Sequence, residues 1–413
     1  KNLKAEIVKA DQGMARFNRQ MASALVRVPI YAATVASMWA PINALRDAFR
    51  QTIELDAQMT VLERVSNGAI SATKALEESV QIAERVGNTI AEVNEGLINF
   101  ARQGYRGEGL TAIAEYATIM SNVSDLSVEE SASALTAAMK GFNIEAENSL
   151  HIVNAMNEVD NNYAITTQQL AEAIQRSAGA AQTYGASLER TIGYATAIGE
   201  VTRESGSVIG NSLKTIMSRI TSVPKAVELL SEIGVAVKDS AGEMRSFDDI
   251  IDDLGQKWSY LSSEQKQNLA LHIAGRYQLS RFLIMMERYD TVLKATETAI
   301  NSHNSAIREN ERYLDSYEAK INRVRNAWTE TTISMQEAFI GDALLAFTHL
   351  ATNAINIVAK FIDTFGLLPP LFLVASTTLF AFRKSFMQLH TIQKIAENFR
   401  LTKAEILATN TAL

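Results

Sequence analysis

Apolar side chains recur at intervals of three and four residues through the middle of the chain, between residues 110 and 286. This spacing is typical of helices that bury one face. Two of the clearest runs contain Leu126, Ala134, Leu135, Ala138 and Met139, and then Ile144, Leu150, Ile152, Val153 and Met156. Glycines punctuate the pattern at positions 141, 185, 199, 210, 234 and 275. We therefore predict a series of short helices packed around a common core.

Three sequences in this stretch match the capping box, in which a hydroxyl and a carboxyl or amide three residues later satisfy free backbone N–H groups. They are Ser127-x-x-Glu130, Thr166-x-x-Gln169 and Ser262-x-x-Gln265. Each predicts the start of a helix. The first two lie 39 residues apart, a spacing typical of helical repeats. Two such copies are explained more simply as the common pattern of capped helices.

One stretch departs from the helical pattern. Residues 233–237 alternate apolar and small side chains, and a turn sequence with Asp239 and Gly242 separates them from Met244 and Phe247. Alternation flanking such a turn predicts a β-hairpin over residues 233–247. An isolated hairpin is marginally stable, so we expect it to pack on neighbouring helices. The predicted fold class is all-α, a multi-helix core with one small β-hairpin.

A seven-residue spacing replaces this pattern after residue 286. The positions are Leu293, Ile300, Ile307, Leu314, Ile321, Trp328 and Met335. Such a repeat predicts a long helix over residues 291–342 with an apolar seam that can form a coiled coil. The seam is narrow because the complementary positions are poor: Thr296, His303, Asn310, Tyr317 and Val324. A single long helix lying on the core explains the spacing equally well.

Two uncharged stretches are candidates for contact with a lipid bilayer. Val28–Leu45 is at the lower limit of length for a spanning helix, and we favour a buried helix there. Thr364–Phe382 is the better candidate because Arg383 and Lys384 follow it directly. Adjacent prolines at 369 and 370 argue against a straight span. A buried pair of hydrophobic helices is the alternative reading.

Composition narrows the possible chemistry. The net charge of −7 over 413 residues argues against sequence-independent binding of nucleic acid, which needs a basic face. The chain has no cysteine, so it has no disulfide framework and no thiolate metal site. Its five histidines are scattered, and none has a partner at metal-ligand spacing. We predict no catalytic residue, no cofactor and no metal.

Two motifs imitate binding sites. Gly206 and Gly210 precede Lys214-Thr215, but the Gly-Lys-Thr of a phosphate loop is absent, so these glycines are better explained by close helix packing. Four acidic residues also cluster at a probable helix start, namely Asp248, Asp249, Asp252 and Asp253. They lack the alternating ligands of a calcium loop, and favourable interaction with the helix dipole explains them more simply.

Five blocks in order carry a family resemblance. They are AAMKGFNIEAENSLHIVNAMNEVDNNYAIT from Ala137, TRESGSVIGNSLKTIMSRI from Thr202, IGVAVKDSAGEMRSFDDIIDDLGQKW from Ile233, IAGRYQLSRFL from Ile273, and YEAKINRVRNAWTETTISMQEAFIG from Tyr317. With these blocks, the chain resembles the core domain of phage tail tape measure proteins over roughly residues 45–385. The structural residues singled out in and around them are Gly141, Gly234, Gly242, Gly275, Arg276 and Trp328. Gly275 is expected to permit a close helix crossing or a helix break beside Arg276.

The resemblance and the patterns together divide the chain. We expect an N-terminal helix with a hydrophobic segment (1–47), a tape measure core domain (48–290), the heptad-patterned helix (291–342), a hydrophobic segment that is a candidate for membrane activity (343–384) and the start of a further helix (385–413). The chain starts at Lys1 rather than Met and ends within a helical pattern, so we expect a fragment of a longer protein.

The resemblance implies a structural protein of the tail lumen, near the tail tip, that templates tail assembly, sets tail length and is released to aid genome ejection through the host envelope. Its implied partners are the tail tube protein, distal tail and tail hub proteins, tail assembly chaperones, further copies of itself as a trimer or higher oligomer, and the host membrane, with phage DNA met only indirectly. A pore-forming or membrane-translocating helical protein that is not a ruler is the alternative. An enzyme is the third class, although the chain lacks a nucleophile elbow and a paired His and Glu.

Overall fold

The computed structural model describes residues 54–330 apart from 317, 324 and 328, and every regular element in this range is a helix. The first half contains α3 (Ala72–Val86), α4 (Ile90–Arg102), α5 (Gly107–Asn122), α6 (Val128–Phe142), the short 3-10 helix η1 (Ala146–Asn148), α7 (Leu150–Asn162) and α8 (Thr167–Tyr184). The second half contains α9 (Leu188–Thr202), α10 (Gly206–Ser222), α11 (Pro224–Glu232), α12 (Phe247–Trp258), α13 (Ser263–Glu287), α14 (Tyr289–Ile300) and α15 (Ser305–Leu314). Residues 54–65, and the described residues of 318–330, are also helical.

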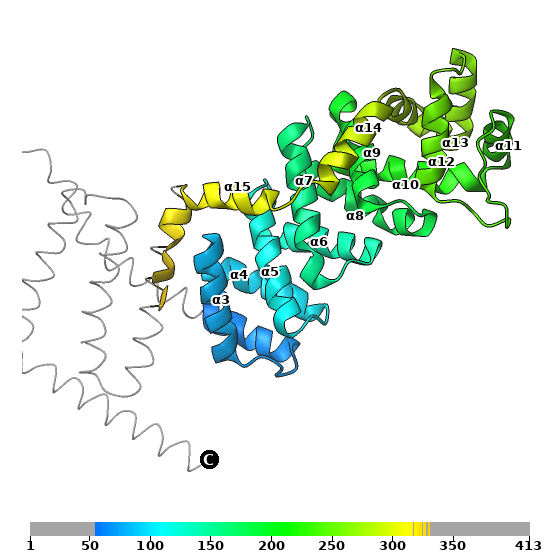
Figure 1. Ribbon diagram of the computed structural model, residues 1–413. Coiled ribbons are helices and arrows are strands. Elements are labelled where there is room, and N and C mark those ends of the chain that lie inside the picture. The colour runs from blue at the N-terminus through cyan, green and yellow to red at the C-terminus, as the bar shows by residue number, and fades with distance from the viewer. Residues whose placement is uncertain (1–53, 317, 324, 328, 331–413) are drawn as a thin grey trace, which may run out of the picture.

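The helices form an elongated stack, with α3 to α5 toward one end and α11 to α13 toward the other (Figure 1). The main contacts between helices pair α8 with α10, α9 with α14, and α6 with α8. After α14 the chain turns back, so that α15 lies on α7 and α5 and leads toward the first helices of the stack (Figure 1). The end of the described chain therefore lies beside its beginning.

All three predicted capping boxes are present. The hydroxyls of Ser127, Thr166 and Ser262 accept a backbone N–H from the residue three positions later, and that residue's side chain accepts the N–H of the cap. A fourth box, Thr89 with Glu92, begins α4 and was not predicted. Because each box satisfies two otherwise unpaired donors within four residues, these helix starts are set by local sequence.

A single hydrophobic cluster runs through the stack from Leu55 to Ala306. The largest of its fully buried side chains are Tyr194, Phe100, Phe247 and Phe282. Burial of one such aromatic or aliphatic side chain contributes about 1.5–3 kcal/mol. The all-α class with one common core is therefore confirmed for the described residues.

The β-hairpin predicted over residues 233–247 is not confirmed as a sheet. One antiparallel bridge joins Lys238 and Met244, and no strand is present among the described residues. Two backbone hydrogen bonds cross the turn, from the Asp239 N–H to Glu243 at 2.9 Å and from the Arg245 N–H to Val237 at 3.0 Å. The Asp239 carboxylate accepts two further N–H groups within the turn, so this short pairing is stabilised locally and does not extend into strands. Val235 and Val237 bury their side chains in the helical core. The alternation therefore reflects a loop that packs two valines on helices.

The long helix predicted over residues 291–342 is wrong in its first part. It ends at Ile300 and resumes only at Ser305, and Asn304 between them has a left-handed φ of 55°. Three positions of the predicted seam are also about half exposed to solvent: Leu293 is 44% exposed, Ile300 53% and Ile321 51%. The part of the chain that the structure describes therefore does not use the heptad row as a buried seam.

No helix within the described range is long and apolar enough to cross a membrane. Val28–Leu45 and Thr364–Phe382 lie outside the described residues, as do the expected segments 343–384 and 385–413. The bilayer contacts expected of these stretches therefore stay predictions.

Candidate functional site

Two glycines bring α10 into backbone contact with α8. A Cβ atom at Gly206 would lie 2.0 Å from the Gln169 carbonyl oxygen, and one at Gly210 would lie 2.3 Å from the Ala173 carbonyl oxygen. Both distances are far below van der Waals contact, so only glycine allows this approach. This is the close helix packing that the sequence favoured over a phosphate loop.

Other crossings are built in the same way. A Cβ at Gly141 on α6 would lie 2.3 Å from the Cβ of Ala178 on α8, and one at Gly193 on α9 would lie 2.4 Å from the Thr296 hydroxyl on α14. At Gly255 on α12, the added atom would lie 2.3 Å from the Tyr289 ring. The body of the molecule is thus held by helix crossings that leave no room for a methyl group.

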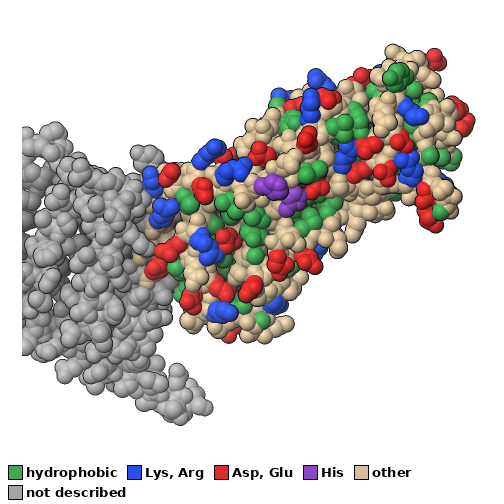
Figure 2. All heavy atoms as spheres, in the orientation of Figure 1, with side chains coloured by type: hydrophobic (Ala, Val, Ile, Leu, Met, Phe, Trp, Pro, Cys, Tyr) green, Lys and Arg blue, Asp and Glu red, His purple; other side chains and the backbone are tan. Residues whose placement is uncertain are grey.

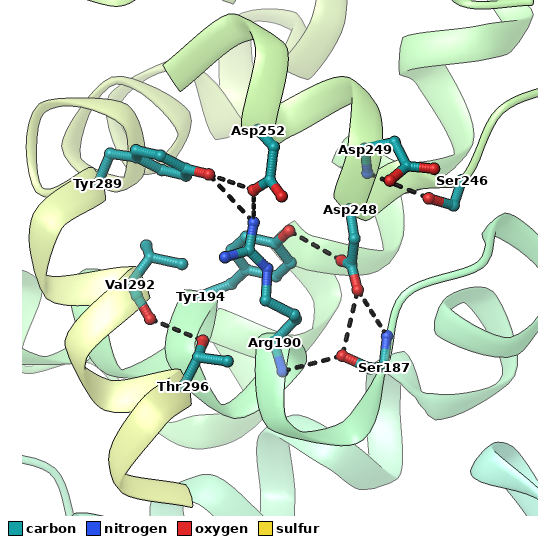
Figure 3. Close-up of polar contacts among 10 residues, drawn as sticks. All are labelled: Ser187, Arg190, Tyr194, Ser246, Asp248, Asp249, Asp252, Tyr289, Val292 and Thr296. Carbon is teal, nitrogen blue, oxygen red and sulfur yellow. Dashed lines mark hydrogen bonds and ion pairs between the residues drawn. The ribbon is translucent and has the colours of Figure 1, made fainter. Parts of the chain in front are cut away.

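A polar network at the junction of α9, α12 and α14 is the most elaborate side-chain cluster of the described residues (Figure 3). The Arg190 guanidinium on α9 forms an ion pair with the Asp252 carboxylate on α12. The Tyr289 hydroxyl at the start of α14 donates to the same carboxylate and accepts a hydrogen bond of 3.1 Å from Arg190. One turn away along α12, the Asp248 carboxylate accepts from the Tyr194 hydroxyl at 2.8 Å. Three helices are therefore joined by one set of charged hydrogen bonds.

Burial shifts the pKa values of groups in this network. It raises the pKa of the Tyr194 hydroxyl well above its ordinary value, and the nearby Asp248 carboxylate raises it further. Burial also raises the pKa of Asp248, opposed by hydrogen bonds from Ser187 and Tyr194 and by the charge of Arg190. Arg190 lies over the Tyr194 ring, with its guanidinium carbon 5.4 Å from the ring centre. The carboxylates and hydroxyls of the network are thus paired with neighbours in the protein, as in a structural ion-pair cluster, whereas the buried Nε of Arg190 has no hydrogen-bond partner among the described residues.

The acidic cluster on α12 is divided among separate partners. Asp248 accepts the Ser187 N–H at 2.9 Å and so caps α9, while Asp252 pairs with Arg190 and Asp253 pairs with Arg245 at 2.6 Å. Asp248 and Asp249 lie in the first turn of α12, where the helix dipole favours them as expected. No group of acidic and histidine side chains within the described ranges could hold a metal ion. The helix dipole is therefore only part of the explanation, because three of the four carboxylates also bind particular partners.

The remaining predicted structural residues lie apart from one another. Gly275 interrupts α13 with φ 72° and ψ 173°, so the helix break is the arrangement found there, and Arg276 beside it is exposed. The Lys257 ammonium donates to the Gly234 carbonyl at 3.1 Å, beyond the end of α11, and Gly242 occupies the turn after Asp239. Gly141 lies at the α6–α8 crossing described above, and Trp328 lies outside the described residues.

Two solvent-open cavities, of about 570 and 710 Å³, lie elsewhere on the stack. The larger contains His151 and Glu189, whose Nε2 and Oε1 atoms are 2.6 Å apart. The hydrogen bond to Glu189 raises the pKa of His151, and the bond to His151 lowers the pKa of Glu189. Acidic and basic side chains are interspersed over the face shown in Figure 2, without one extended patch of either sign. The geometry thus provides a rigid scaffold.

Sequence reasoning missed the partners that make this scaffold. Nothing near Arg190 in the sequence indicates that it pairs with Asp252, 62 residues away. Several asparagines, including Asn154, Asn322 and Asn326, also form buried hydrogen bonds that no local motif announced. The only signal in the sequence was the presence of asparagines at helix positions that would otherwise bury an apolar side chain.

Comparison with known proteins finds similarity to phage tail proteins. The family model of phage-related minor tail proteins matches residues 71–275, which include α3 to α12 and the first half of α13. The tape measure protein of Pneumococcus phage Dp-1 is 24% identical over 337 residues, 78% of this chain and 29% of that protein. Probable tape measure proteins of Halomonas phage phiHAP-1 and Escherichia phage P2 are 25% and 23% identical, over 54% and 49% of this chain. No solved structure matches.

Over residues 71–275, the chain therefore matches the family of phage-related minor tail proteins. The relatives narrow this class further, and the chain belongs to the phage tail tape measure family. It spans only about a quarter of the length of the curated relatives it matches, at 29%, 22% and 26%.

Proposed function

We propose that this chain is the folded core part of a tape measure protein, which occupies the tail lumen, templates polymerisation of the tail tube and sets tail length. The observation that carries the proposal is the family match over residues 71–275, the range that the structure shows as a packed helical stack. Its relatives are named tape measure proteins in three different phages. Tail tube, tail hub and chaperone proteins are the partners that this role would require.

Tail length provides the direct test. In a phage that carries the complete gene, an in-frame deletion of about 70 residues outside the matched core should shorten the tail by about 105 Å, because a helical residue rises about 1.5 Å. A duplication of the same segment is the matched control and should lengthen the tail equally. Electron micrographs measure both. Tails of unchanged length in both variants would contradict the ruler.

We also propose that the protein contacts a membrane when it leaves the tail. The observation behind this part is the uncharged stretch Thr364–Phe382 with its basic flank. The full chain should release dye from anionic vesicles, and Leu373→Asp with Leu379→Asp should abolish release, since each charge costs about 2.5–3.5 kcal/mol at mid-depth. Matched charges outside the stretch, Gln388→Asp with Gln393→Asp, should leave release intact. Equal release by both double variants would exclude this segment as the membrane contact.

Self-association is the last part of the proposal. The row of Leu293, Ile300, Ile307, Leu314 and Ile321 has the seven-residue spacing of a coiled-coil seam, and three of these side chains are exposed. A seam of this kind can bury its side chains against the same row of further copies. Sedimentation velocity of the full chain would give the number of copies.

A further inference from the structure

The described chain after α14 lies across the other helices as a strap. The strap comprises the described residues of 301–330, and it runs from the end of α14 over α7 and α5 to the loop between α3 and α4 (Figure 1). Leu314 and Ala319 of the strap contact Gly87 in that loop, where an added Cβ would lie 2.7 and 3.1 Å from their side chains. The strap therefore joins the two ends of the described chain.

Asparagine side chains make most of the hydrogen bonds between the strap and the body beneath it. On the body side, Asn122 donates to Asn310 at 2.7 Å, Asn157 donates to the Ser305 hydroxyl at 2.9 Å, and Asn154 accepts the Ala306 N–H at 3.0 Å. On the strap side, Asn322 donates to the Gly87 carbonyl at 3.1 Å, and Asn326 donates to the Asn88 carbonyl at 2.7 Å and accepts the Ile90 N–H at 3.2 Å. Each such bond contributes only about 0.5–1.5 kcal/mol net, because release of the strap exchanges it for bonds to water.

The face that the strap buries consists of small or polar side chains. Its buried residues are Ser302, Ser305, Ala306, Asn310, Ala319, Asn322, Asn326, Ala327 and Thr329. Two buried atoms at this interface, the Asn88 side-chain oxygen and the Ser302 hydroxyl oxygen, have no hydrogen-bond partner among the residues that the structure describes. By contrast, α14 buries Val292, Ala295, Thr296 and Ala299, packs on both α9 and α7, and approaches the α9 backbone closely at Gly193. The strap is therefore the weakly held part of the described structure.

The large apolar side chains of the strap are less buried than its asparagines, and of these side chains Leu314 contacts the body at Gly87. Ile321 is exposed, and Ile307 and Leu314 are partly buried, whereas the asparagines beside them are buried. The row that these residues would form needs one continuous helix, and the left-handed Asn304 breaks it. The folded arrangement thus satisfies the asparagines and leaves the heptad row incomplete.

We propose that the strap detaches from the folded body as a unit, and that its release allows residues 289–330 to form one helix with a complete heptad row. While it is attached, the strap leaves the heptad row incomplete and so prevents self-association through it. This control step rests on the self-association proposed above, whereas the release step rests only on the polar interface between strap and body.

A reversible disulfide clamp tests the release step in the full chain. The chain has no cysteine, so Asn157→Cys with Ser305→Cys introduces the only pair, at side chains joined by a hydrogen bond of 2.9 Å across the strap interface. By hydrogen exchange with mass spectrometry, we expect strap amides to exchange about two orders of magnitude faster than those of α8 and α10 in the wild type. The oxidised clamp should slow the strap amides and leave α8 and α10 unchanged. Reduction should restore fast exchange.

Substitutions test whether the asparagines hold the strap. Asn322→Ala with Asn326→Ala should accelerate exchange in the strap alone, whereas Asn211→Ala, at an exposed position of α10, should change neither region. A strap that exchanges together with α8 and α10 in the wild type would overturn the release step. An oxidised clamp without effect on the strap would overturn it as well.

Sedimentation velocity then tests control of self-association. The reduced clamp should associate and the oxidised clamp should remain monomeric at the same concentration. Equal association of both forms would overturn the control step while leaving release intact. Tail length in the phage is a separate measurement, so failure of the ruler and failure of the strap are distinguishable.

Discussion

Gly210→Ala is the sharpest test of how this scaffold is held together. Gly210 lies in the middle of α10, where its backbone approaches that of α8. Alanine favours a helix interior over glycine by about 0.8–1 kcal/mol, so propensity alone predicts that the variant is more stable. The packing predicts the opposite, because the new methyl group would lie 2.3 Å from the Ala173 carbonyl oxygen and 2.8 Å from the Arg176 Cβ.

The carbonyl is a fixed part of α8 and cannot rotate away. The two helices must therefore separate by about 1 Å at this point, and they lose contact along the crossing. Overpacking of this kind costs about 1–3 kcal/mol. Gly179→Ala on α8 is a matched control, because no atom lies within 4 Å of the added methyl group and the glycine is exposed and helical. It should gain about 0.8–1 kcal/mol.

Urea unfolding followed by circular dichroism at 222 nm would measure both variants against the wild type. Both variants gain the same helix propensity, so they should differ by the overpacking cost alone, about 1–3 kcal/mol, with Gly210→Ala the less stable. Far-ultraviolet spectra of the folded proteins should be unchanged, which excludes a general loss of helix. If Gly210→Ala is as stable as Gly179→Ala, the α8–α10 crossing is looser than the structure shows and the reasoning fails.

Three further changes test the network, the ionised pair and the helix break. Asp252→Ala removes the partner of a buried guanidinium and should cost about 1–3 kcal/mol in thermal unfolding, whereas Asp290→Ala breaks an exposed pair and should cost under about 0.5 kcal/mol. Because folding raises the pKa of His151, its protonated form stabilises the fold below the ordinary pKa of 6.5, and this stabilisation is lost as pH rises through the pKa of the folded protein. Because folding lowers the pKa of Glu189, its ionised form stabilises the fold above the ordinary pKa of 4.5. His151→Gln should therefore be most destabilising near pH 5.5 in urea unfolding and lose its effect in alkaline buffer; an equal effect at both pH values would contradict the pair. Gly275→Ala should cost about 1–3 kcal/mol in the same assay through its backbone conformation, and an unchanged midpoint would show that the break is not fixed.

Features set by neighbouring residues could be predicted from the sequence. The capping boxes act within four residues, and their presence at Ser127, Thr166 and Ser262 follows from a hydroxyl and an acceptor at fixed spacing. The packing role of Gly206 and Gly210 was also foreseeable, since two glycines one turn apart give a helix a flat face. The all-α class follows from the same local rules.

Features that depend on distant partners could not be predicted. The spacing of the aspartates on α12 fits a helix start, but the role of Asp252 depends on Arg190, which the fold brings near from 62 residues away. The alternation at Val235 and Val237 is the same for an edge strand and for a loop that buries two valines. In both cases the local pattern is compatible with more than one arrangement, and tertiary contacts decide which one forms.

The heptad row is a different kind of disagreement. A row of apolar residues at seven-residue spacing costs solubility when it stays in solvent, as Leu293, Ile300 and Ile321 do. Asparagines on the buried side of a strap are equally unusual, because apolar side chains there would hold it more firmly. The local sequence preferences of a segment normally agree with its place in the fold. The strap exposes apolar side chains and buries polar ones, and such a conflict is characteristic of a segment with a second arrangement. The close glycine crossings show no such conflict. A body fixed by packing and a strap fixed by exchangeable hydrogen bonds allow one part of the chain to extend while the other stays folded.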